Sequence, residues 1–203
     1  MKFSKIKSYA KLNLSLNIIK KIPKKLHAIE SLVTFINFYD LIYIRETKAL
    51  KHKITFLGKF SKNITKNNTV NKLLNLLDRK ELLRGKKFEI KIIKNIPQKS
   101  GMGGGSMNAS TIGKFLLKKK IINLSKKNIN NIMKNIGSDV PLGMNFKNTI
   151  MSKTGKLTIK EKKLGLYTLI VKPNFGCSTK AIYLKTKEQT ISKYNNPKTS
   201  FFS

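Results

Sequence analysis

Acidic residues are scarce in this sequence: nine Asp and Glu stand against 43 Lys and Arg in 203 residues, for a formal net charge of +34. Arginine is scarce too, and accounts for only three of the 43 basic residues. Arginine is the usual residue for two-point contacts with phosphates and bases, whereas the abundant lysine, asparagine and isoleucine all have AT-rich codons. Codon drift therefore accounts for the charge and argues against nucleic acid as the main partner. It also makes the three aspartates informative: Asp40, Asp78 and Asp139.

Tryptophan is absent, and there is a single cysteine, Cys177, which excludes an internal disulfide and fits a reducing compartment. No run approaches the roughly 18 apolar residues of a membrane helix. Near the basic start of the chain, Asn13, Ser15 and Asn17 interrupt any apolar signal core. Hydrophobic residues still make up 40% of the chain, enough for a core. We expect a cytoplasmic protein without a membrane partner.

Hydrophobic periodicity indicates a mixture of strands and helices. Residues 8–19 alternate apolar and polar side chains, which is typical of a half-buried strand with one polar face. Apolar residues at i, i+3, i+4 and i+7 predict an amphipathic helix over 69–83, and Ser125 is a candidate N-cap of a helix that ends at Gly137. Further expected elements are strands over 28–46, 53–58, 87–95 and 166–172, helices over 106–119 and 178–194, a turn over 22–25, and a hairpin over 149–159 that turns near Gly155. This order predicts the α+β class.

Four of the 12 glycines lie between positions 101 and 105, between a predicted strand and a predicted helix. A glycine-rich turn lets backbone N–H groups approach a phosphate closely, and the N-terminus of the following helix adds oriented positive charge. The spacing fits neither the Walker loop nor the dinucleotide fingerprint. The segment therefore predicts a phosphate-binding loop of another kind.

The segment from Asn95 to Ser106 resembles the ATP loop of the GHMP kinases. Three other segments are similar to motifs of this family in the same order: Ala10–Leu14 to the first motif, Leu26–Leu32 to a cytidine-recognition segment, and Ile136–Pro141 to the segment with the catalytic aspartate. The resemblance runs from about residue 6 to about residue 185. It implies a GHMP-kinase N-terminal ATP-binding domain with a ribosomal-protein-like fold over residues 1–163, followed over 164–203 by the beginning of a ferredoxin-like C-terminal domain.

The resemblance implies an ATP-dependent kinase that acts on a small alcohol, with Mg²⁺ as the metal. The Gly-Gly-Gly-Ser form is similar to the branch that phosphorylates the 2-hydroxyl of a cytidyl-diphosphate methylerythritol, in the non-mevalonate route to isoprenoid and terpenoid precursors. The family's ATP-binding positions fall here on one continuous loop: Pro97, Gln98, Lys99, Ser100, Gly101, Met102, Gly103, Gly104, Gly105, Ser106 and Met107.

The resemblance also implies roles for residues outside the loop. Asp139 matches the catalytic base, and Lys11 matches the lysine that keeps this carboxylate ionised and polarises the acceptor hydroxyl. Asn13 shares a strand face with Lys11 and is expected to support that pair or the substrate. His27 matches a residue that reads the cytosine ring.

Two positions depart from the family pattern. Leu26 replaces a tyrosine that stacks on the base, and Met107 replaces a serine, so that magnesium contacts near the loop would depend on Ser106, phosphate oxygens and water. The family's third, glycine-rich motif also has no counterpart, because no glycine follows Gly176. We therefore expect a chain that lacks most of its C-terminal domain, with that segment missing or supplied separately, and that has little or no kinase activity without it.

Two other functions stay open at this point. One is a GHMP kinase for another small alcohol, such as homoserine or mevalonate, which the His27 segment and the triple glycine disfavour. The other is a basic RNA-binding protein, since the family's N-terminal fold resembles that of a ribosomal protein. RNA binding would favour aromatic side chains interleaved with basic ones on one face, and the sequence shows no such stripe.

Overall fold

The computed structural model describes residues 2–22, 26–161, 165, 167–171 and 190–193, with the side chains of residues 21, 22, 26 and 27 excluded. These residues divide into two compact units. Unit 1 consists of Met1–Ala10, Asn37–Gln98 and Met102–Asn145, and unit 2 of Lys11–Ile36, Lys99–Gly101 and Phe146–Ser203. Two long paired strands, β1 (Ser4–Ile22) and β2 (Leu26–Thr47), contribute residues to both units.

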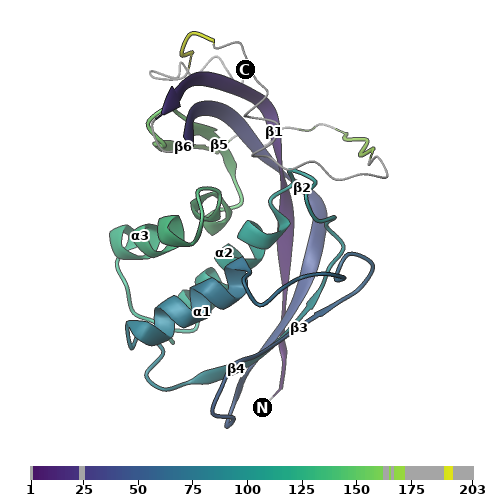
Figure 1. Cartoon of the computed structure of the whole chain (residues 1–203), viewed down its shortest axis with the longest axis vertical. Helices are drawn as coiled ribbons and strands as arrows, with labels where there is room; N and C mark the ends of the chain where they lie inside the picture. Colours follow the sequence, from purple (N-terminus) through teal and green to yellow (C-terminus); the bar gives the residue numbers. More distant parts are fainter. Residues whose placement is uncertain (1, 23–25, 162–164, 166, 172–189, 194–203) are drawn as a thin grey trace. The chain divides into compact units, whose positions relative to one another are not determined.

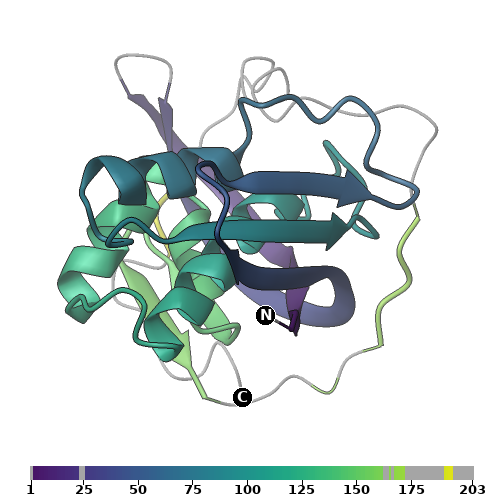
Figure 2. The ribbon, with the colours of Figure 1, turned by 90° about the horizontal axis from the view of Figure 1, so that it is seen from below.

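The sheet of unit 1 adds β4 (Lys87–Ile93) and β3 (Lys53–Leu57) to one side of β2. Strand β4 is antiparallel to β2, from Leu41 opposite Ile93 to Thr47 opposite Lys87. Strand β3 is parallel to β4, and Figure 2 shows the two arrows side by side and pointing the same way. Alternate side chains of β4 are fully buried (Phe88, Ile90 and Ile92). The sheet thus has one inner face that builds the core.

Three helices cover this inner face: α1 (Thr69–Arg79), α2 (Gly104–Lys118) and α3 (Lys126–Ile136). Figure 1 shows them together on one side of β3 and β4. Helix α1 buries the four residues of its predicted apolar stripe, Val70, Leu73, Leu74 and Leu77. The helix ends at Arg79 rather than at residue 83, because the chain turns there and Glu81 and Arg84 adopt left-handed φ angles of 55° and 51°.

Helix α3 confirms the predicted boundaries. The Ser125 hydroxyl accepts a hydrogen bond from the Asn128 amide at 3.2 Å, and the helix ends before Gly137. The short 3-10 helix η1 (Val140–Met144) follows and contacts both α2 and α3. At Gly143 a Cβ atom would lie only 2.8 Å from Cβ of Ser110, so the absence of a side chain allows η1 to pack against α2.

Unit 2 is built on the other parts of β1 and β2. Strand β5 (Asn148–Met151) is antiparallel to β2, with Ser31 opposite Met151, and β6 (Leu157–Lys160) is antiparallel to β5. The β5–β6 hairpin confirms the prediction for residues 149–159, and Gly155 makes its turn with a φ angle of 74°. Together the two units confirm the α+β class.

The predictions for the last forty residues are partly wrong. Residues 167–171 have no regular secondary structure, so the strand expected over 166–172 does not form there; no strand within the described ranges pairs with them, and an unpaired strand leaves its backbone groups without ladder bonds. Residues 190–193 are not helical either: the Thr190 amide donates to Ile18 O at 2.9 Å and the Lys193 amide to Glu30 Oε2 at 2.7 Å. Three parts of these predictions lie outside the described residues: residues 178–189 and 194 of the expected helix, residues 166 and 172 of the expected strand, and residues 23–25 of the expected turn.

Candidate functional site

The glycine-rich loop connects β4 to α2, as the sequence predicts, and its backbone turns through left-handed conformations. Lys99, Gly101 and Gly103 have φ angles of 53°, 74° and 70°. Helix α2 begins at Gly104, two residues earlier than expected, with Gly103 as an N-cap that offers no side-chain hydrogen bond. The first N–H groups of a helix have no partner within it. The start of α2 therefore presents backbone donors, aligned with the positive end of the helix, to an anion.

Close packing explains why glycine stands at the first two positions of α2. A Cβ atom on Gly104 would lie 3.0 Å from Cγ2 of Ile96 and 3.1 Å from Nζ of Lys94. On Gly105 it would lie 3.2 Å from Oγ1 of Thr69, whose hydroxyl donates to the Gly105 carbonyl at 2.6 Å. The loop is thus pressed against the end of β4 on one side and the start of α1 on the other.

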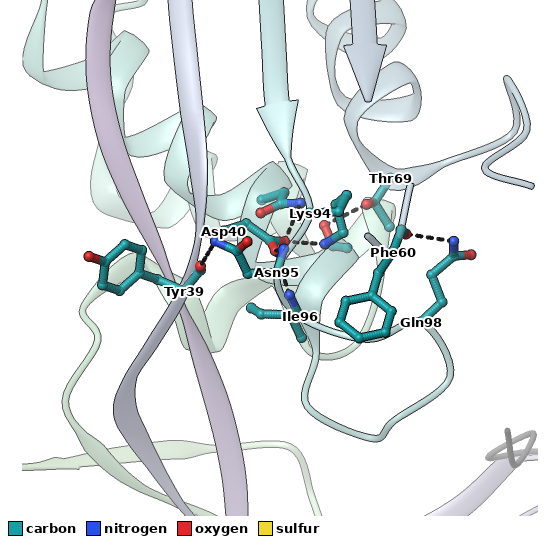
Figure 3. A network of polar contacts seen from close by, with 10 residues as sticks. Tyr39, Asp40, Phe60, Thr69, Lys94, Asn95, Ile96 and Gln98 are labelled. Atoms are coloured by element: carbon teal, nitrogen blue, oxygen red, sulfur yellow. Dashed lines mark hydrogen bonds and ion pairs between the residues drawn. The ribbon is translucent and has the colours of Figure 1, made fainter. Parts of the chain in front are cut away.

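A buried carboxylate anchors the start of the loop (Figure 3). Asp40 Oδ1 accepts hydrogen bonds from the amides of Asn95 and Ile96, both at 2.8 Å. Asp40 Oδ2 accepts from the Asn108 side chain at 3.0 Å and pairs with the ammonium group of Lys94. The Asn95 side chain also donates to Tyr39 O at 2.9 Å. Strand β2, the loop and α2 are thereby joined at one point.

The ion pair between Asp40 and Lys94 lies in the interior, where their side chains are 0% and 4% exposed. Burial lowers the pKa of Lys94, and the neighbouring Asp40 carboxylate opposes that shift. In the sequence, Asp40 stands out only because aspartate is rare, and no motif marks Lys94 or Asn108. A signal was present for Asp40, because strand alternation places it on the same face as the buried Ile42 and Ile44. An aspartate at such a position requires buried partners.

Other loop residues make contacts that hold the loop in the fold. The Gln98 amide donates to the carbonyls of Phe60 at 2.9 Å and Lys62 at 2.6 Å, so it ties the loop to the segment after β3. Met102 and Met107 are buried, and the Met107 amide already bonds to Gly103 O at 2.8 Å. Met107 therefore contributes packing in this structure, while Ser106 is half-buried. Of the remaining predicted positions Pro97 is buried, Lys99 exposed and Ser100 half-buried.

Lys11 lies on β1 in unit 2 and is only 7% exposed. Its ammonium group donates to Asn13 Oδ1. The role of Asn13 toward the Lys11–Asp139 pair or the substrate stays a prediction. Asn13 in turn donates to Ser31 Oγ at 2.6 Å, and the Ser31 hydroxyl donates to Ser15 O at 2.7 Å. This chain of hydrogen bonds crosses from β1 to β2 and holds the lysine in one orientation.

Asp139 is half-buried and stands immediately before η1, where its carbonyl accepts from the Leu142 amide at 3.2 Å. Because Asp139 belongs to unit 1 and Lys11 to unit 2, their pairing stays a prediction. His27 lies near the beginning of β2, and its side chain is outside the described part of the chain. Its contact with cytosine also stays a prediction.

Contrary to the expectation from the sequence, aromatic and basic side chains do gather on one face of the sheet. On the outer face of the unit 1 sheet, Phe3 and Tyr43 contact edge to face with centroids 6.5 Å apart, Arg45 lies 4.4 Å from the Phe3 centroid, and Lys7 lies 4.4 Å from the Tyr39 centroid. These residues lie on β1 and β2 or, for Phe3, directly before β1, and they meet only when the two strands pair. Arg45 also bonds to Glu89 at 2.5 Å. Contacts within the sheet thus account for the stripe without a nucleic-acid partner.

A family profile and two solved structures indicate the class of protein to which this chain is similar. The sequence profile of the GHMP kinases N terminal domain matches residues 68–147, which include the loop, α2 and Asp139. A crystal structure of a 4-(cytidine 5'-diphospho)-2C-methyl-D-erythritol kinase has the same fold, with a TM-score of 0.62 at 19% identity over 77% of this chain and 55% of that chain. Mevalonate pyrophosphate decarboxylase from Streptococcus pyogenes shares it too, with a TM-score of 0.57 at 15% identity over 80% of this chain and 52% of that chain.

Curated relatives narrow the class to one family. A 4-diphosphocytidyl-2-C-methyl-D-erythritol kinase of Pelagibacter ubique (strain HTCC1062) is 50% identical over 98% of this chain and 70% of its own length. The kinase of the same name from Clostridium botulinum (strain Loch Maree / Type A3) is 34% identical over 96% of this chain and 68% of its own length. The chain belongs to the 4-diphosphocytidyl-2-C-methyl-D-erythritol kinase family of GHMP kinases.

Proposed function

We propose that this chain binds ATP and transfers its γ-phosphoryl group to the 2-hydroxyl of 4-diphosphocytidyl-2-C-methyl-D-erythritol. The observation that carries the proposal is the loop between β4 and α2, whose uncapped helix N-terminus is held by buried contacts. The family membership supplies the acceptor. No helix in the described ranges is long and apolar enough to cross a membrane.

The loop binds the phosphates. Backbone N–H groups at the start of α2 donate to phosphate oxygens and stabilise the charge that develops during transfer. The described residues include no cluster of three His, Cys, Asp or Glu side chains that could hold a metal. Mg²⁺ would therefore be held largely by ATP phosphate oxygens and water, with the Ser106 hydroxyl beside the phosphates, as is common for this ion in kinases.

Three side chains handle the acceptor. Asp139 accepts the proton of the 2-hydroxyl as the hydroxyl oxygen attacks the γ-phosphorus, and ADP leaves from the opposite side. Lys11 polarises the hydroxyl, and its bond to Asn13 holds it in place. His27 reads the cytosine ring, which needs a planar group that can donate and accept.

The test is an ADP-release assay with a panel of acceptors, on the chain alone and on the chain with a C-terminal segment added. With that segment present, we expect turnover with 4-diphosphocytidyl-2-C-methyl-D-erythritol and none with homoserine or mevalonate. The Asp139→Asn variant, purified in parallel, controls for contaminating kinases. A preference for homoserine or mevalonate would transfer the assignment to another GHMP kinase activity.

A further inference from the structure

The buried contacts at the base of the loop carry one inference that rests on the proposed function and deepens it. We propose that Asp40 is a positioning residue for ATP, acting through Asn95, Ile96, Lys94 and Asn108 to hold the loop and the start of α2 in the orientation that receives the phosphates. Both Asp40 and Lys94 are buried. Because both side chains are buried, the effect passes through the backbone that they support.

The carboxylate of Asp40 is used on both oxygens. Oδ1 accepts from two successive amides, those of Asn95 and Ile96, where the chain leaves β4 and enters the loop. Oδ2 accepts from Lys94 and from Asn108, which lies one turn into α2. Only an ionised carboxylate offers acceptors in both directions. A side-chain amide at this position would turn an N–H donor toward one of these two pairs of donors.

The position of Lys94 explains why the charge of Asp40 matters. The Lys94 Nζ atom would lie 3.1 Å from a Cβ on Gly104, so the ammonium group sits beside the first residue of α2. This is the positive end of the helix, where a cation is unfavourable. Burial also lowers the pKa of Lys94. The Asp40 carboxylate compensates both effects, and without it the ammonium group would lose its partner and the packing under Gly104 would change.

Breaking a buried ion pair is often costly for stability, so the test uses two variants. Asp40→Asn places an N–H donor opposite one of the two pairs of donors that the carboxylate now accepts from. Asn108→Ala removes one of these donors and leaves the ion pair between Asp40 and Lys94 intact. The matched control is Asp78→Asn, which removes another carboxylate of unit 1 that binds Lys87 at 2.8 Å and His52 at 3.0 Å, outside the loop contacts. Thermal unfolding identifies which variants are folded at the assay temperature.

The measurements are the dissociation constant for MgATP by calorimetry and the separate KM values for ATP and acceptor. For Asp40→Asn we expect the dissociation constant for MgATP to rise roughly tenfold to a hundredfold, as for a small misplacement of a binding group. The KM for the acceptor should be unchanged. For Asn108→Ala we expect about threefold to tenfold, the worth of one hydrogen bond. Asp78→Asn should bind ATP like the unmodified chain. A purely structural role would lower the unfolding temperature without separating the two KM values.

Hydrogen–deuterium exchange without nucleotide provides a second readout. We expect faster exchange over residues 94–107 in both loop variants and no change there in Asp78→Asn. If folded variants bind ATP as tightly as the unmodified chain, the inference is overturned whatever the exchange shows. If Asp40→Asn is unfolded, Asn108→Ala alone decides. If the unmodified chain does not bind ATP, the proposed function fails. Independently of that result, loop exchange in Asp40→Asn and Asn108→Ala that equals the exchange in the unmodified chain would overturn the role of Asp40.

Discussion

At the scale of single residues, His52 shows how burial determines which form of a side chain the fold accepts. Its Nδ1 atom accepts from the Phe88 amide at 3.0 Å, and its Nε2 atom lies 3.0 Å from Asp78 Oδ2. The first contact requires Nδ1 without a proton, so Nε2 carries the proton and donates to Asp78. Burial lowers the pKa of His52; Asp78 opposes this shift, and Lys87 adds to it. The folded state therefore favours neutral His52.

This preference predicts a dependence of stability on pH. Because the pKa of His52 in the folded state lies below the value of 6.5 for the free side chain, the contribution is fully present above about pH 6.5 and is lost as the pH falls below that value. His52→Asn keeps an acceptor for the Phe88 amide but does not titrate. We expect the fall in melting temperature from about pH 8 to about pH 5.5 to be smaller in this variant, by calorimetry. An equal fall in both proteins would contradict the assignment.

Gly104 gives a second prediction at this scale. Replacing it with valine places branched carbons against Ile96 and Lys94, where even one Cβ is tight at 3.0 Å and 3.1 Å. We expect Gly104→Val to abolish measurable ATP binding, with far-UV circular dichroism largely unchanged. The control is Gly165→Val, because Gly165, like Gly104, has no left-handed φ angle, and no atom lies within 4 Å of its Cβ position. Unchanged ATP affinity in Gly104→Val would remove the loop from the proposed site.

At the scale of elements, the contact between η1 and α2 determines where Asp139 stands. Gly143 in η1 lies against Ser110 and Met107 of α2, and a Cβ at that position would be 2.8 Å and 2.9 Å from their side-chain atoms. The Ser110 atom is a Cβ and cannot rotate away from the helix backbone. Since Asp139 directly precedes η1, the separation between η1 and α2 bears on the proposed catalytic base.

Gly143→Ala should therefore affect both stability and activity. We expect a loss of about 1–3 kcal/mol in the free energy of unfolding, as for overpacking in a close-packed interior, and a lower kcat with the ATP affinity little changed. Denaturant unfolding and steady-state kinetics measure the two effects. Gly165→Ala is the control, because its Cβ position has no atom within 4 Å. A destabilised variant with an unchanged kcat would separate η1 from the positioning of Asp139.

At the scale of the whole molecule, the proposed chemistry requires residues from both units, with Lys11 in one and Asp139 in the other. In a full-length context, we expect Asp139→Asn to lower kcat by roughly 10²–10⁴-fold, the usual contribution of a positioned base, with similar ATP affinity. Lys11→Met should have an effect of the same order.

The double variant tests whether the two residues act together. If Lys11 and Asp139 act as a pair, the kcat of the double variant should be little lower than that of either single variant. The losses from residues that act together are strongly non-additive. Kinetics of the four proteins, measured with the same acceptor, complete the cycle. Multiplicative losses would show that the two residues act independently.

The sequence was sufficient for features that depend on neighbouring residues. Period-two and period-3.6 patterns predicted most strands and helices, Ser125 and Gly137 marked the ends of α3, and the glycine cluster marked the loop. The predictions were wrong where the structure of a segment depends on contacts with residues distant in the sequence. Residues 167–171 have the composition of a strand but no pairing partner in the described part of the chain, and residues 190–193 bond to β1 and β2 instead of continuing a helix.

The tertiary structure alone decided the contacts that hold the candidate site. Asp40 meets Lys94 and Asn108, which are 54 and 68 residues away along the chain, and the aromatic–basic stripe forms only when two strands pair. Periodicity assigns each of these residues to a face of its own strand or helix. Which faces meet depends on strand register and on how the helices pack on the sheet, and both are set by the burial of the whole core rather than by any local segment.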